Sequence, residues 1–62
     1  MLNQLQPDLR RLLDLTRKME NFDATLAAAR TAGKPIDPKQ PALDERRRME
    51  QEATHLRAKW DI

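Results

Sequence analysis

The sequence predicts an all-α fold, a two-helix antiparallel hairpin with coiled-coil character, and three features of its composition predict it. Residues that favour strands are scarce, since the chain has no Val, two Ile and four Thr. Ala, Leu, Arg, Gln and Glu dominate, and these residues favour helices. The only Gly is Gly33, and three of the four Pro follow it between residues 35 and 41. A chain interrupted at one place is expected to form two helices, one on either side of the interruption.

The first helix is expected over about residues 7–32. Pro7 suits a first helical position, because its φ angle is fixed near the helical value. An earlier start, with Asn3 as the N-cap, is the alternative. Apolar residues then recur every three or four positions, as one helical face requires: Leu9, Leu12, Leu15, Met19, Phe22, Leu26 and Ala29. Gly33 and the following Pro35 end this helix.

The turn is expected over about residues 33–40, and the second helix over about residues 41–60. Pro41 disfavours helical geometry at Gln40, so the regular helix is expected to begin at residue 41. The apolar stripe of this helix is narrow and consists of Ala42, Met49, Ala53, Leu56 and Trp60. Such a narrow stripe is typical of a coiled-coil seam rather than of a helix in a globular core.

A short connection between two amphipathic helices makes them antiparallel neighbours, so residues 1–62 are expected to form one helical-hairpin domain. The core of a 62-residue chain is small, and without Cys no disulfide supports it. We therefore expect the hairpin to complete a bundle, either by self-association, most simply as a homodimer, or with a partner protein. In a hairpin centred near Asp37, Trp60 is expected across from Leu12 or Leu13.

The expected contact surface begins where the second helix ends. The second helix is expected to cover the first only back to about residue 11, which leaves the leucines nearer the N-terminus without an intramolecular partner. Aromatic side chains on the stripes add area of the kind that dominates protein interfaces. The predicted protein-interface residues are Leu2, Leu5, Leu9, Leu12, Phe22, Leu56 and Trp60. Of these, the row of Leu2, Leu5 and Leu9 is expected to dock against a second subunit or a target protein.

The distribution of charge favours a protein partner over nucleic acid. Twelve Lys and Arg against ten Asp and Glu leave a net charge of +2, and acidic residues are interspersed along the chain. The only basic run is Arg46-Arg47-Arg48, which is the candidate contact for phosphates. The pairs Asp44–Arg48 and Arg46–Glu50 are expected to neutralise part of this run. A hairpin dimer that binds nucleic acid through the run is therefore the alternative function.

The residues that catalysis needs are largely missing. The chain has no Cys, no Tyr, one His and no glycine-rich loop, so no pair of nucleophile and base follows from the spacing. Glu52-x-x-His55 has the spacing of helical metal sites, but on a helical wheel both side chains point away from the apolar stripe. We expect no enzyme activity, no cofactor, no bound metal and no small-molecule substrate.

No apolar run reaches the roughly 18 residues of a membrane span, and the N-terminus lacks the basic and apolar regions of a secretory signal. A cytoplasmic protein is therefore expected. The chain has eight Arg but only four Lys, which indicates a bacterial or phage genome. In size and shape alone, the hairpin resembles plasmid copy-number hairpins that dimerise and bind RNA, and small hairpin co-chaperones of bacterial secretion systems. The function predicted from the sequence is a non-enzymatic protein–protein interaction module, a chaperone, adaptor or inhibitor that presents an apolar helical face.

Overall fold

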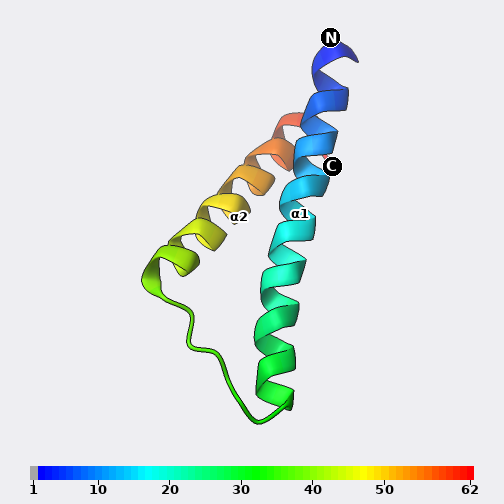
Figure 1. Cartoon of the computed structure of the whole chain (residues 1–62). Coiled ribbons are helices and arrows are strands. Elements are labelled where there is room, and N and C mark those ends of the chain that lie inside the picture. Colours follow the sequence, from blue (N-terminus) through cyan, green and yellow to red (C-terminus); the bar gives the residue numbers. More distant parts are fainter. Residues whose placement is uncertain (1) are drawn as a thin grey trace.

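The structure is a computed structural model that describes the backbone of residues 2–62 and the side chains of residues 4–62. Its two helices, α1 over Leu2–Thr31 and α2 over Gln40–Trp60, pack against each other, and residues 2–62 contain no strand. The all-α prediction and the helical hairpin are therefore confirmed. The molecule is elongated, 49 × 19 × 15 Å along its principal axes, and Figure 1 shows α1 running along its whole length.

The start of α1 differs from the expected one. The helix begins at Leu2 rather than near Pro7, which lies in its second turn. There Pro7 cannot donate a hydrogen bond to the carbonyl four residues earlier, so this end of the helix lacks one backbone bond. Helix propensity offsets that loss, because Gln4, Leu5 and Gln6 all favour helix. The early turns also contact α2, since Lys59 Nζ lies 3.5 Å from the Gln4 Oε1 atom.

Gly33 ends α1 as predicted. Its φ angle of +78° lies in the left-handed region, which Gly adopts without steric cost. The Gly33 amide donates to the Arg30 carbonyl at 3.1 Å, and the Lys34 amide donates to the Ala29 carbonyl at 3.0 Å. These bonds satisfy carbonyl groups that the end of a helix leaves free.

The second helix begins one residue before the predicted position. Lys39 is the N-cap residue, and its side chain makes no capping hydrogen bond. Pro41 lies in the first turn of α2, where its missing amide donor costs no intrahelical bond. Residues 34–39 form an irregular linker between the helices. At the other end of α2, Asp61 adopts a left-handed conformation, and the Ile62 amide donates to the Arg57 carbonyl at 3.0 Å.

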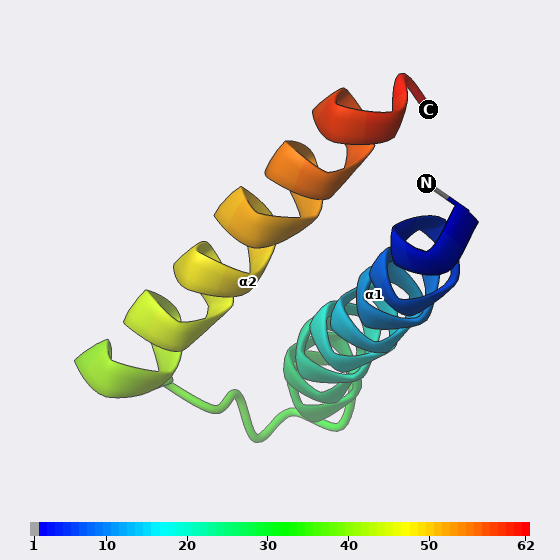
Figure 2. The same cartoon turned by 90° about the horizontal axis from the view of Figure 1, so that it is seen from above.

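The core lies where the two predicted apolar stripes meet. Leu15, Ala53 and Leu56 are buried, with 1%, 2% and 7% of their surface exposed. Three partly buried side chains pack around them: Leu12, Met19 and Met49. From this contact the helices diverge toward the linker, and the same divergence is visible in the perpendicular view (Figures 1 and 2).

The pairing of the helices is shifted from the expected register. Trp60 Nε1 donates to Asp8 Oδ2 at 2.8 Å, four residues nearer the N-terminus than Leu12. The midpoint between Asp8 and Trp60 and the midpoint between Asp23 and Arg46 both fall at residues 34 to 35, not at residue 37. The linker explains the shift, because it runs back along the length of the hairpin, and away from α1, before α2 begins (Figure 1). As a result α2 contacts α1 at Asp8 and, through Lys59, at Gln4, further toward the N-terminus than sequence spacing predicts.

Candidate protein-interaction site

An apolar groove lies at the wide end of the hairpin, where the two helices diverge. It has a volume of 340 Å³ and is open along one side. Two turns of α1, the linker and the first turn of α2 contribute its walls, and the residues that line it are Asn21, Phe22, Thr25, Leu26, Ile36, Pro38 and Ala42. We name this site the wide-end groove.

The sequence builds the groove by extending an apolar stripe beyond the packed core. Phe22 and Leu26 continue the stripe of Leu15 and Met19 by one and two further turns. The residue that α2 supplies at this level is Ala42, which is too small to fill the space between the diverging helices. Phe22, Leu26 and Ala42 are therefore only half-buried within this chain.

The polar residues of the groove do not disturb its apolar character. The Thr25 hydroxyl donates to the Asn21 carbonyl at 2.7 Å, so its hydrogen-bonding need is met within α1. Ile36, in contrast, is 52% exposed on the linker, with polar or proline neighbours on both sides. The groove thus combines four half-buried apolar residues, Phe22, Leu26, Pro38 and Ala42, with the more exposed Ile36.

One ion pair joins the two helices beside the groove, and a second lies within α2. Two guanidinium nitrogens of Arg46, Nε and Nη2, donate to the Asp23 carboxylate at 2.9 Å, and the third, Nη1, lies 3.3 Å from Glu50 Oε2. The hydrogen bonds from Arg46 lower the pKa of Asp23 below its ordinary value of 3.8. A two-bonded arginine–carboxylate pair fixes geometry as well as charge, so it sets the spacing of α1 and α2 at the groove.

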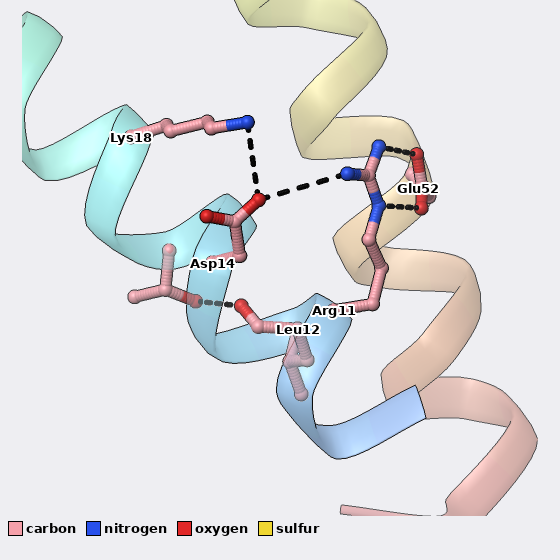
Figure 3. Close-up of polar contacts among 6 residues, drawn as sticks. Arg11, Leu12, Asp14, Lys18 and Glu52 are labelled. Carbon is pink, nitrogen blue, oxygen red and sulfur yellow. Dashed lines mark hydrogen bonds and ion pairs between the residues drawn. The ribbon is translucent and has the colours of Figure 1, made fainter. Parts of the chain in front are cut away.

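Two further clusters cross the helix interface toward the narrow end. Figure 3 shows the Arg11 guanidinium extending from α1 to the Glu52 carboxylate of α2. Arg11 Nε donates to Glu52 Oε2 at 2.6 Å, and Arg11 Nη2 donates to Glu52 Oε1 at 2.9 Å. Lys59 Nζ donates to Asp8 Oδ2 at 2.7 Å, beside the Trp60 bond to the same oxygen. These hydrogen bonds lower the pKa of Glu52 and of Asp8, the latter through Lys59 first and Trp60 second. The narrow end is thus held by polar contacts around an apolar core.

The predicted interface residues fall into different environments. The side chain of Leu2 lies outside the described residues. Leu12 and Leu56 pack in the core between α1 and α2, and Phe22 lines the wide-end groove. Leu5 and Trp60 are half-buried, and Leu9 is 37% exposed. The structure therefore brings Leu12 and Leu56 together with each other and places Phe22 in a separate site.

Sequence reasoning missed most of the wide-end groove. Of its lining residues, only Phe22 was among the predicted interface residues. The others are Asn21, Thr25, Leu26, Ile36, Pro38 and Ala42, although the isolated apolar Ile36 in a polar linker was an available signal. The position of the groove could not be read from the sequence, because it depends on how far apart the linker holds the helices.

Two apolar residues outside the groove are exposed although the sequence did not single them out as interface residues. Leu13 is 66% exposed and Leu43 is 37% exposed. From the sequence, Leu13 was expected as one of two possible residues opposite Trp60. In the folded chain it lies on a separate surface of α1.

The basic run has less free charge than its sequence suggests. The Arg46 side chain is 24% exposed and is engaged by Asp23 and Glu50, the second of which was expected. Arg48 Nη1 lies 3.9 Å from Glu45 Oε2 rather than pairing with Asp44. Arg47 is exposed. Because carboxylates surround most of the run, phosphate binding there would compete with existing ion pairs.

Glu52, part of the Glu52-x-x-His55 spacing, is held by Arg11 instead of facing a metal site. Among the side chains described, no group of three or more His, Cys, Asp or Glu lies close enough to hold a metal ion. Within residues 2–62, neither helix has the length and apolar character of a membrane span. Comparison of the chain with protein-family profiles, with curated proteins and with solved structures finds no match.

Proposed function

We propose that this protein is a non-enzymatic protein–protein interaction module, a chaperone, adaptor or inhibitor, whose wide-end groove receives apolar side chains of a partner helix. The observation that carries the proposal is the groove itself, a 340 Å³ space with Phe22, Leu26 and Ile36 in its walls. An amphipathic helix that lays its apolar face into such a groove is a recurring mode of protein recognition.

The shape and the charge of the groove favour a protein ligand. It is open along one side and formed by two helices and a linker, whereas sites for small molecules usually enclose most of the ligand. Lys34 and Lys39 are exposed on the linker beside Ile36, with Asp37 as the acidic residue between them. A partner helix with acidic residues flanking its apolar ones therefore fits this end of the hairpin best.

The small core is the second support for a partner. Leu15, Ala53 and Leu56 are the buried apolar residues of the described chain, whereas several Leu and Ile side chains remain exposed. Burial of those side chains stabilises a protein, so association with another surface is favourable. We propose an antiparallel hairpin that completes a helical bundle with a partner and with a second copy of itself.

Site-specific photo-crosslinking in the cells that express the protein tests the groove. A photoreactive amino acid at Ile36 should link to one protein, and the same amino acid at Gln51, on the exposed face of α2, should not. Phe22→Ser should abolish the link from position 36, because it places a hydroxyl in the apolar wall. Equal linking from both positions, or linking that Phe22→Ser leaves unchanged, would contradict the proposal.

Nucleic-acid binding is the second candidate, and the exposed Arg47 and Arg48 are the observation in its favour. Phosphate contacts release counterions, so their affinity falls steeply as salt rises from about 50 to about 200 mM. Titration of labelled RNA and DNA at both salt concentrations separates the two functions. We expect no salt-dependent binding. Binding that weakens with salt and disappears in Arg47→Ala/Arg48→Ala would establish the nucleic-acid function instead.

A further inference from the structure

A second exposed surface follows α1 on the side away from α2. Its members share one helical stripe and are, in order, Leu9, Leu13, Arg17, Glu20, Ala24 and Ala27. At about 100° per residue, this stripe lies roughly 130° around α1 from the stripe that packs on α2. All six residues are exposed, and Leu13 is 66% exposed. We name it the outer face of α1.

The size and the charge of the side chains change along the outer face of α1. Its N-terminal end carries the large apolar Leu9 and Leu13, and its C-terminal end carries the small Ala24 and Ala27. Between them lie Arg17 and Glu20, which have opposite charges. In the part of the chain whose side chains are described, neither of these two takes part in an ion pair.

We infer that the outer face of α1 binds the same face of a second copy, with the two α1 helices antiparallel about a two-fold axis between Arg17 and Glu20. This inference gives a surface to the self-association within the proposed function. In that arrangement Arg17 of each copy lies opposite Glu20 of the other, which forms two ion pairs. Leu13 lies opposite Ala24, so a large side chain fills the space beside a small one.

The same pattern argues against a parallel pairing. A parallel pair would place Arg17 against Arg17 and Glu20 against Glu20, and like charges in direct contact are repulsive. It would also place Leu13 against Leu13 and Ala24 against Ala24, which leaves a gap at one end. A two-fold contact in which one patch meets its own copy is the usual form of a homodimer interface.

The outer face and the wide-end groove are separate surfaces. The groove is lined by Phe22, Thr25 and Leu26 of α1, none of which belongs to the outer face. A dimer through the outer face therefore leaves both grooves open for partner helices. For the same reason, loss of the dimer in a variant does not predict loss of the crosslink from Ile36, and the two proposals can fail independently.

Cysteine crosslinking tests the register, and the absence of native Cys makes it specific. A disulfide requires Cα atoms within about 7 Å of each other. In the antiparallel pair, position 13 lies opposite position 24, whereas the two copies of position 13 are separated by about 16 Å along the helix axis. We expect a mixture of Leu13→Cys and Ala24→Cys chains to form a disulfide-linked dimer under mild oxidation, and each variant alone to form far less. A mixture of Leu13→Cys and Gln51→Cys is the matched control.

Sedimentation of charge variants is the second measurement, with helicity by circular dichroism as the check that they fold. Arg17→Glu should raise the dissociation constant of the dimer at least about tenfold. It replaces each of the two Arg17–Glu20 ion pairs by two carboxylates that repel each other. Arg17→Glu/Glu20→Arg should restore most of the affinity, and Arg47→Glu on α2 should leave it unchanged.

Three results would overturn the inference. Disulfide formation by Leu13→Cys alone would show a parallel pair. A monomeric mass at all concentrations, with no linked species in the mixture, would remove the dimer. Linking of Leu13→Cys only to other proteins, when extract of the expressing cells is added, would assign the outer face to a foreign partner.

Discussion

Leu15 occupies the centre of the hairpin core, with 1% of its surface exposed. Ala53 and Leu56 of α2 surround it, together with Leu12 and Met19 of its own helix. We expect Leu15→Ala to lower the free energy of unfolding by about 2–5 kcal/mol, because it removes buried carbon and leaves a cavity. Ile62→Ala, at a site that is 65% exposed, should cost less than about 0.5 kcal/mol. Urea denaturation of the two variants measures both values, and equal losses would contradict a core at this position.

The two residues with left-handed backbone give opposite predictions. A Cβ added at Gly33 would meet no atom within 4 Å, so it causes no clash with neighbouring residues. Gly33→Ala should nevertheless lower the free energy of unfolding by about 1 kcal/mol, because a φ angle of +78° is unfavourable for Ala. Asp61 already carries a side chain at a φ angle of +54°. Asp61→Gly should therefore raise the free energy of unfolding by up to about 1 kcal/mol, because Gly adopts this conformation without steric cost. Thermal denaturation compares the variants. A gain from Gly33→Ala, or a loss from Asp61→Gly, would contradict the helix ends described here.

At the scale of the elements, the two prolines within helices occupy unequal positions. Pro7 lies in the second turn of α1 and removes a backbone hydrogen bond, whereas Pro41 lies in the first turn of α2, where no such bond exists. Pro7→Ala should raise the helicity, and it should raise the free energy of unfolding by about 1–3 kcal/mol. Pro41→Ala should change little. Circular dichroism and thermal denaturation measure both, and an unchanged helicity in Pro7→Ala would indicate that α1 begins at Pro7 after all.

The helices were predictable because their signals are local. The apolar repeat of α1 and the break at Gly33 depend on neighbours in sequence, and both were predicted correctly. The start of α1 was not, since contacts such as Lys59 with Gln4 arise only when the helices pack. The same limit applies to Asp8 and Asp23, whose partners lie on the other helix and could be identified only once the register was known.

At the scale of the whole molecule, three carboxylates that bridge the helices tie stability to pH. The pKa values of Asp8, Asp23 and Glu52 are all lowered in the folded state by hydrogen bonds from the other helix. A lowered folded pKa contributes stability above the unfolded value, near 3.8 for Asp and 4.5 for Glu, and this contribution is lost as pH falls through the lower folded value.

We therefore expect the melting temperature to fall on acidification below about pH 4.5. Asp8→Asn/Asp23→Asn/Glu52→Gln should be less stable at neutral pH and should flatten this dependence. The exposed pairs are also screened by salt, so the difference between the two proteins should shrink at high ionic strength. Melting curves across the acid range test this expectation, and a melting temperature that rises on acidification would contradict it.

The whole-molecule shape was the part that the sequence predicted least. A regular hairpin would pack the stripes along their full length, and the groove at Phe22, Leu26 and Ile36 would then be closed. The divergence of the helices depends on the path of residues 34–39 and on the spacing that the Arg46–Asp23 pair sets. Neither property has a local signature in the sequence.

The central claim is that the hairpin has a closed core at its narrow end and an open binding groove at its wide end. Residue-resolved amide hydrogen exchange of the purified protein without a partner tests this claim most directly. Exchange reports the local free energy of opening. We predict the strongest protection around Leu15 in α1 and from Ala53 to Leu56 in α2, and clearly weaker protection from Phe22 to Thr31 and from Gln40 to Arg46. Uniform protection along both helices, or stronger protection at the wide end, would contradict the claim.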